Sequence, residues 1–343
     1  MKILGIETSC DETAMSVIEV SGKDKIKVLS NVVSSQIKLH AKYGGVVPSL
    51  AAREHVKNIK HVFKLALKEA DIKDFKKEID LISVTHGPGL GPALLVGLTF
   101  AKTISWLHKK HLVGVSHLEG HIYSNWLNEN FKPKTVKFPV LNLLVSGGHT
   151  ELVLMKNYGK FKIIGETMDD AVGEAFDKVA RLLGLGYPGG PAVSKIAEKG
   201  NPDKYPLPRP MISSKNYNFS YSGLKTAVLY LIRDLNLKKI DEQTKADIAS
   251  SFQKSAVDVL IQKTMRAAKE FEVKSILLSG GVSANKMLRS ELQKNTTEAG
   301  MAYFQPPMEY TTDNAPMIAV AGYFNYKQKT PLSGVKMDAN LEF

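Results

Sequence analysis

The sequence has a single cysteine, Cys10, among 343 residues, and no apolar run long enough to cross a membrane. One cysteine excludes an internal disulfide and a cysteine-based zinc cluster, so a metal site would need histidines and carboxylates. A transmembrane helix takes about 20 predominantly apolar residues. A signal peptide needs its apolar stretch where this chain carries Glu7. We therefore expect a cytoplasmic protein with no membrane segment.

Acidic residues are outnumbered. The chain has 46 Lys and Arg against 34 Asp and Glu, which gives a net charge of +12. Such an excess favours a polyanionic partner, either nucleic acid or an acidic membrane surface. A lysine-rich proteome would produce the same balance, so the charge alone does not select a function.

Strand-like and helix-like segments alternate along the chain, which indicates an α/β fold. Strands are expected at 3–8, 14–20, 26–33, 79–85, 112–116, 140–146, 151–155 and 275–279. Helices are expected at 49–70, 92–108, 118–127, 169–183, 222–235, 243–271, 284–294 and 313–326.

The two halves of the chain share a plan. Each begins with a strand, a polar turn and a strand, and later has a buried strand that breaks at glycines into a helix. This favours two lobes, at 1–137 and 138–312, each a mixed sheet flanked by helices, as in the actin, hexokinase and Hsp70 superfamily. A single doubly wound sheet is the alternative. The helix at 313–326 is expected near the lobe interface, and 327–343 is expected to be a tail.

His117 and His121 lie four residues apart on a predicted helix, so their side chains share one face and can share a metal ion. Zinc proteases have this spacing with a glutamate directly after the first histidine. Here the acid is Glu119, which lies roughly 200° around the helix from His117 and points away from such a metal. The pair alone is more typical of two packed side chains. Asp313 is the candidate third ligand, and its alternative role is to cap the following helix.

Two Ser-Gly-Gly turns follow predicted buried strands, at 146–148 and 279–281. Glycine turns leave backbone N–H groups accessible to phosphate or carboxylate oxygens, although the first is also compatible with an ordinary hairpin. Asp177, on a predicted helix, is either a ribose-binding acid or a solvated carboxylate. Asp11 and Glu12 occupy the first polar turn, where members of the superfamily place an acid near phosphate.

Ten blocks, in order along nearly the whole chain, resemble the tRNA N6-adenosine threonylcarbamoyltransferase family. They are 5–13, 43–48, 87–90, 117–121, 144–150, 173–178, 187–191, 219–226, 279–285 and 312–314. The resemblance implies one Fe²⁺ or Zn²⁺ ion per subunit, held by His117, His121 and Asp313. It also implies substrate contacts at Leu144, Val145, Ser146, Gly147, Gly148, Asp177, Gly190 and Asn285.

Enzymes of this family take the threonylcarbamoyl group from threonylcarbamoyl-adenylate and place it on N6 of adenosine 37 in tRNAs that read codons beginning with A. The product is N6-threonylcarbamoyladenosine (t6A), and AMP is released. Because the donor is already activated, the protein must position it, polarise its carbonyl and accept a proton from N6. We hypothesise that Asp11, with Glu12 beside it, accepts that proton.

The resemblance also implies partners. These are tRNA, the adenylate, small accessory proteins of the t6A pathway in bacterial relatives, and a homodimer in mitochondrial ones. Three competing functions remain open: a metal-dependent endopeptidase, a small-molecule kinase of the same superfamily, and a non-catalytic tRNA-binding scaffold.

Overall fold

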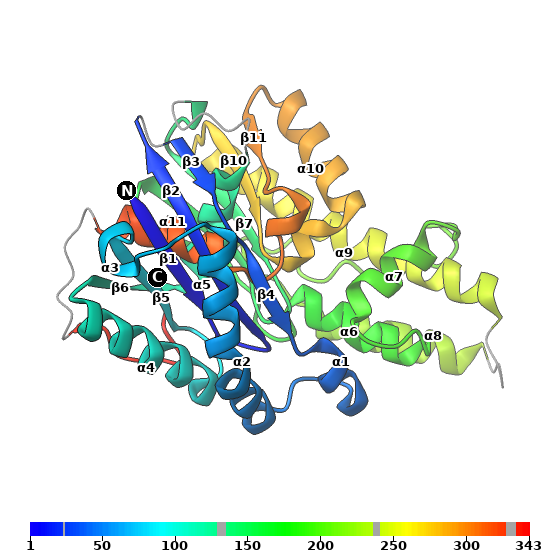
Figure 1. Cartoon of the computed structure of the whole chain (residues 1–343). Coiled ribbons are helices and arrows are strands. Elements are labelled where there is room, and N and C mark those ends of the chain that lie inside the picture. The colour runs from blue at the N-terminus through cyan, green and yellow to red at the C-terminus, as the bar shows by residue number, and fades with distance from the viewer. Residues whose placement is uncertain (23–24, 129–134, 236–240, 327–333) are drawn as a thin grey trace. The chain divides into compact units, whose positions relative to one another are not determined.

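The computed structural model describes residues 1–22, 25–128, 135–235, 241–326 and 334–343. It divides into two compact units (Figure 1). The first unit comprises Met1–Thr135 and Pro306–Phe343, and the second comprises Val136–Gln305. Residues 306–312, which the sequence places in the second lobe, thus belong to the first unit, because the last strand of the second sheet ends at Phe304.

The first unit is built on a six-stranded mixed sheet, with the strand order β3-β2-β1-β5-β6 and with β4 also beside β2. β1 is antiparallel to β2 and parallel to β5, and β5 is parallel to β6. The strands are β1 (Lys2–Glu7), β2 (Glu12–Ser21), β3 (Lys25–Val28), β4 (Val32–Ser35), β5 (Leu81–Gly87) and β6 (His111–Ser116).

Helices cover both faces of this sheet. The helices are α1 (Ile37–His40), α2 (Pro48–Glu69), α3 (Phe75–Glu78), α4 (Gly91–His108), α5 (His117–Tyr123) and α11 (Ala315–Tyr326). α2 and α4 share a core with Leu4 and Ile6 of β1. α11 packs on the opposite face, where a Cβ on Gly5 would lie 2.3 Å from the carbonyl oxygen of Ala315. α11 is apolar around its whole circumference, as a helix buried on all sides must be.

The C-terminal segment joins the first unit. Val335 is buried in the core beneath α2 and α4. His86 Nδ1 donates to the carbonyl oxygen of Lys336 (2.8 Å), and the Asp338 amide donates to the carbonyl oxygen of His86 (2.9 Å). The tail expected at 327–343 therefore packs along the end of β5 over its described part, while 327–333 lie outside the described residues.

The second unit has a five-stranded mixed sheet of order β11-β10-β7-β8-β9. β7, β8 and β9 form an antiparallel meander, and β10 is parallel to both β7 and β11. Its strands are β7 (Val140–Val145), β8 (Thr150–Asn157), β9 (Lys160–Glu166), β10 (Ser275–Ser279) and β11 (Ala302–Phe304). Its helices are α6 (Val172–Leu182), α7 (Gly189–Ala197), α8 (Ser222–Asp234), α9 (Glu242–Glu270) and α10 (Lys286–Glu298).

The expected α/β class and the mixed sheets are confirmed. In each unit a strand hairpin is followed by parallel strands that lead into helices, so the polar residues at the ends of parallel strands meet at one edge of each sheet. Within the described ranges, no helix has both the length and the apolar character that a membrane span requires.

Candidate functional site

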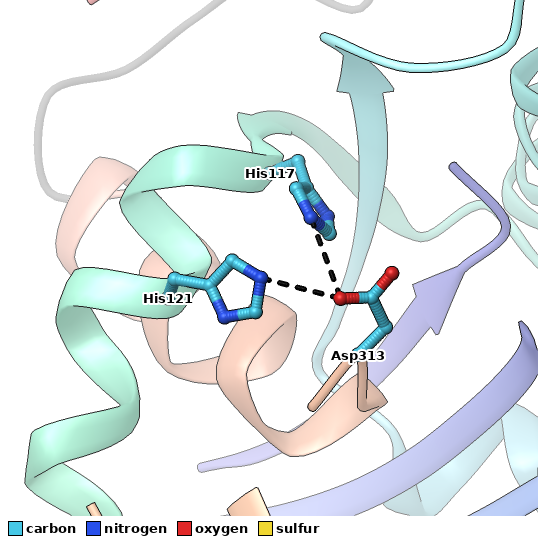
Figure 2. Close-up of side chains that lie close together, drawn as sticks. All are labelled: His117, His121 and Asp313. Carbon is cyan, nitrogen blue, oxygen red and sulfur yellow. Dashed lines mark ion pairs between the residues drawn. The ribbon is translucent and has the colours of Figure 1, made fainter. Parts of the chain in front are cut away.

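The chain brings His117, His121 and Asp313 together in the first unit (Figure 2). β6 ends at Ser116, whose hydroxyl caps α5 by accepting a hydrogen bond from the Leu118 amide (3.3 Å). His117 is the first residue of α5 and His121 lies one turn further along the same face. Asp313 comes from the turn before α11, close in space but distant in sequence.

Asp313 is not the residue that caps α11. The side-chain oxygen of Asn314 accepts a hydrogen bond from the Met317 amide (3.0 Å), which is the bond an N-cap makes. The capping role that the sequence left open for Asp313 is thus filled by its neighbour, and the Asp313 carboxylate is directed at the two histidines.

The three side chains have the spacing of a metal-binding set. The Nε2 atoms of His117 and His121 lie 3.5 and 3.2 Å from Asp313 Oδ1. Ligand atoms about 2.1 Å from a tetrahedral zinc ion are separated from one another by about 3.4 Å. The candidate ligand atoms of the three residues all lie within 4.8 Å of one another. The geometry therefore fits a single small cation.

Burial and charge support the same fit. His121 is 1% exposed, and within the described part of the chain neither of its ring nitrogens makes a well-formed hydrogen bond. Burial disfavours the charged ring of His117, yet the carboxylates of Asp313 and Glu7 raise the pKa of His117 to about 9. Without a metal the cluster thus binds an extra proton, and a divalent cation would supply that positive charge instead.

Glu7 and Ser9, which lie in the family-like block 5–13 but were not predicted as site residues, contact the same site. His117 Nδ1 lies 3.1 Å from Ser9 Oγ and 3.3 Å from Glu7 Oε2. Glu7 ends β1 and has no solvent exposure. The sequence could have indicated Glu7 only by its position at the end of a predicted strand, directly before the polar turn. Its burial, which marks it as a site residue, cannot be read from the sequence.

Asp11 and Glu12 lie in the turn between β1 and β2. Asp11 is 7% exposed, and its Oδ2 atom has no hydrogen-bond partner among the described residues. Glu12 accepts a hydrogen bond from Ser35 Oγ (2.9 Å). Burial, and then the charges of Asp313 and Asp11, raise the pKa of Glu12 to about 9. Glu12 thus lies in the electrostatic neighbourhood of the candidate ligand Asp313, and Asp11 lies in that of Glu12.

The two Ser-Gly-Gly turns follow the neighbouring parallel strands β7 and β10 of the second unit. A Cβ on Gly280, whose φ is +86°, would lie 2.4 Å from the carbonyl oxygen of Val145. Gly147 and Gly148 are exposed, and Cβ atoms built on them would meet open space. Leu144 and Val145 are fully buried, so neither their side chains nor their backbones are open to a ligand in this structure.

The other predicted substrate residues of this unit already hold its helices together. Asp177 Oδ1 accepts a hydrogen bond from the Gly189 amide at the start of α7 (2.7 Å). Asn285 Oδ1 caps α10 by accepting from the Leu288 amide (3.0 Å), and its Nδ2 donates to Ser194 and Gln253 (2.9 and 2.8 Å). Gly190 has open space where a Cβ would be.

Comparison with known proteins agrees with this geometry. The family model described as tRNA N6-adenosine threonylcarbamoyltransferase matches residues 27–320. The chain belongs to this threonylcarbamoyltransferase family. A family member from Thermosipho africanus is 50% identical over 343 residues, which cover 100% of this chain and 98% of the relative. One from Bacillus subtilis is 50% identical over 329 residues, or 96% of this chain and 91% of the relative. Both carry the family's name.

Two kinds of solved structure share the fold. HypF from T. kodakarensis has a TM-score of 0.64 at 16% identity, covering 95% of this chain and 48% of that one, so this chain spans about half of HypF. An activator of 2-hydroxyisocaproyl-CoA dehydratase from Clostridium difficile has a TM-score of 0.50 at 13% identity over 96% and 99% of the two chains. At these identities the likeness concerns the fold alone. The expected family and transferase class are confirmed, and the α/β fold is shared with these solved structures.

Proposed function

We propose that this transferase binds one divalent metal ion, Fe²⁺ or Zn²⁺, through His117, His121 and Asp313 and makes t6A. Its donor is threonylcarbamoyl-adenylate, and its acceptor is N6 of adenosine 37 in tRNAs that read codons beginning with A. The observation that carries the metal site is the convergence of two buried imidazole Nε2 atoms on one carboxylate oxygen at 3.2 and 3.5 Å.

The ligand set suits the chemistry. Three protein ligands leave positions for substrate oxygens, so the metal, when bound, would polarise the carbonyl of the threonylcarbamoyl group and orient it. Two neutral imidazoles and one carboxylate suit iron or zinc, and the absence of a sulfur ligand matches the single cysteine of the chain.

Asp11 is the proposed proton acceptor. Transfer forms a bond between N6 and the carbamoyl carbon, breaks the bond from that carbon to the adenylate phosphate oxygen, and releases a proton from N6. Asp11 Oδ2 is a buried oxygen without a hydrogen-bond partner in the described part of the chain, so it has room to accept that proton. Glu12, whose pKa is raised to about 9, is protonated at neutral pH and is less suited to that task.

The second unit supplies the proposed adenylate contacts. The exposed backbone of Gly147 and Gly148 is suited to bind the phosphate. Ser146, which follows Leu144 and Val145, is half-buried and its amide already donates to the carbonyl oxygen of His149 (2.8 Å), so it would act by holding this turn in shape. Gly190 leaves open space where a ribose or base can approach the backbone. Asp177 and Asn285 would act chiefly by holding the starts of α7 and α10 in place, since their side-chain atoms already bond to those helices.

The rival endopeptidase function is disfavoured by Glu119. Its carboxylate accepts a hydrogen bond from Asn325 Nδ2 of α11 (2.7 Å) rather than facing the histidine pair. It is therefore not placed to activate a metal-bound water, which is the task of the glutamate in zinc proteases.

The function is tested by incubating the protein with threonylcarbamoyl-adenylate and an A-codon-reading tRNA, digesting the tRNA and weighing its nucleosides. Wild type should yield t6A, while His117→Ala and Asp11→Asn should lower the rate by roughly 100-fold or more, since each removes several kcal/mol of stabilisation. His111→Ala, at the exposed start of β6, is the matched control and should retain activity.

Persistence of full activity in His117→Ala would remove the metal from the reaction. Full activity in Asp11→Asn would remove Asp11 as the proton acceptor. No t6A from wild type even with the accessory proteins present, with all reagents proven on a known relative, would favour the kinase or the scaffold function. We further propose that the reaction takes place in the cytoplasm. Small accessory proteins of the t6A pathway, or a second copy of the chain, would take part in it. Running the assay with and without those proteins tests this directly.

A further inference from the structure

The buried carboxylate of Glu7 has no role in the reaction described so far. Both of its oxygens are engaged. Oε1 accepts a hydrogen bond from the Ser9 amide (2.5 Å), and Oε2 accepts one from the Thr85 hydroxyl. The same Oε2 atom lies 3.3 Å from His117 Nδ1, on the opposite side of the ring from the nitrogen that faces Asp313.

The position of the ring proton decides whether His117 can bind a metal. A neutral imidazole carries its proton on one nitrogen and a lone pair on the other. His117 Nε2 faces Asp313, so metal binding there requires the proton on Nδ1. Ser9 Oγ, at 3.1 Å from Nδ1, does not decide this, because a hydroxyl can donate or accept. The ionised Glu7 carboxylate has no proton to donate, so it can act only as a hydrogen-bond acceptor.

We propose that Glu7 is a positioning residue that keeps the proton of His117 on Nδ1 and fixes the orientation of the ring for metal binding through Nε2. Carboxylates that accept from a ligating histidine are a general feature of metal sites, and their loss typically lowers metal affinity 10- to 100-fold. The inference rests on the proposed metal site and assigns it a partner residue on another element, the end of β1.

The fold explains why the carboxylate is held so firmly. β1 and β5 are parallel neighbours with Ile6 beside Val84, so Glu7 and Thr85 come next on their strands at the same edge of the sheet. β6 lies on the far side of β5 and leads directly into His117. The three strand ends thus place an orienting acid, a hydroxyl that fixes it and the metal-binding histidine in one row.

Glu7→Gln is a sharp test because the introduced amide has one acceptor and one donor end. The Ser9 amide requires an acceptor, so the oxygen of the introduced side chain is expected to stay there and its NH₂ group to face His117 Nδ1. That would favour the opposite ring tautomer, with the proton on Nε2. The affinity for Zn²⁺ or Co²⁺, measured by competition with a chelator, should fall 10- to 100-fold. The visible absorption of the bound Co²⁺ should change as well.

The control is Glu119→Gln. It neutralises a carboxylate on the same helix that bonds to Asn325 and not to the histidines, so its metal affinity and Co²⁺ spectrum should match wild type. Because Glu7 also helps to raise the pKa of His117 in the metal-free protein, metal-free Glu7→Gln should melt at a lower temperature than wild type. A purely structural role would lower the melting temperature in the same way but would leave the metal affinity and the Co²⁺ spectrum of the folded protein unchanged.

Two more variants keep the test decisive if Glu7→Gln does not fold. Thr85→Val removes the hydroxyl that fixes Oε2 and should weaken metal binding, whereas Ser9→Ala leaves Glu7 in place and should not. Weaker metal binding in Ser9→Ala than in Thr85→Val, or wild-type metal affinity in Glu7→Gln, would overturn the proposed role of Glu7. If wild type itself showed no metal binding that His121→Ala abolishes, the proposed metal site would fail instead.

Discussion

At the scale of single residues, the first unit concentrates four carboxylates near two histidines. Burial, followed by the charges of Asp313 and Asp11, raises the pKa of Glu12. Burial lowers the pKa of His117, but the charges of Asp313 and Glu7 outweigh it and raise that pKa. Such a group of like charges is costly without a cation, because each charge disfavours the ionisation of the next. Glu12 and His117, whose pKa values are both raised to about 9, are therefore the groups whose titration should reveal the site in the metal-free protein.

Glu12→Gln should stabilise the metal-free protein increasingly as the pH rises. The folded-state pKa of Glu12 is about 9 against an ordinary value of 4.5, so its contribution to stability is fully present below about pH 4.5 and is lost as the pH rises through 9. The melting temperature of the variant should move upward relative to wild type between pH 5.5 and pH 9. The difference at pH 9 should be on the order of several kcal/mol. If the melting temperatures of the variant and of wild type changed with pH in parallel, the pKa of Glu12 would not be raised in the folded protein.

Residue patterns predicted part of this site. The spacing of His117 and His121 indicates a shared face, because a helix repeats every 3.6 residues. Asp313 reads equally well as a helix cap, and only the resemblance to the family identified it as a ligand. Glu7 and Thr85 lie on different strands, 78 positions apart, so no local pattern could reveal their contact.

At the scale of secondary structure, the glycines of the second unit divide into two kinds. Gly280 combines a left-handed backbone with a close approach to β7, so Gly280→Ala should cost about 2–4 kcal/mol of stability from strain and overlap. Gly190 has open space, so Gly190→Ala should change stability by no more than about 0.5 kcal/mol.

The variants Gly190→Ala and Gly280→Ala also test the proposed contact between the adenylate and the backbone at Gly190. If the donor approaches the backbone at Gly190, Gly190→Ala should raise the KM for threonylcarbamoyl-adenylate roughly tenfold, or about 1.4 kcal/mol, with the melting temperature unchanged. Thermal melts and donor titrations on both variants provide the measurement. A Gly190→Ala enzyme with wild-type KM would place the donor elsewhere.

Elements were predictable where apolar periodicity is strong. The parallel strands β1, β5, β6, β7 and β10 and the long helices α2, α4 and α9 match the predicted ranges, whereas the short parallel strand β11 was not predicted. α7 was missed, because residues 186–191 read as a glycine- and proline-rich turn, while the structure begins a helix at Gly189 with Pro191 in its first turn. Proline is accepted there because its missing N–H has no partner within the helix.

At the scale of the whole molecule, the repeated plan of the chain predicted two mixed sheets, and the structure has one in each unit. The return of the chain to the first unit after Gln305 was only partly predictable. α11 is apolar on all sides and must be buried somewhere, but the segment after it bonds to the end of β5 mainly through backbone atoms, which carry no sequence signal.

The central claim is that a metal held by His117, His121 and Asp313 supports the transfer. It is tested most directly by single-turnover formation of t6A, starting from protein stripped of metal with a chelator and titrated anaerobically with Fe²⁺ or Zn²⁺. We predict that activity returns in proportion to bound metal, saturates at one ion per chain, and does not return in His121→Ala. Full transfer by the metal-free protein would contradict the claim.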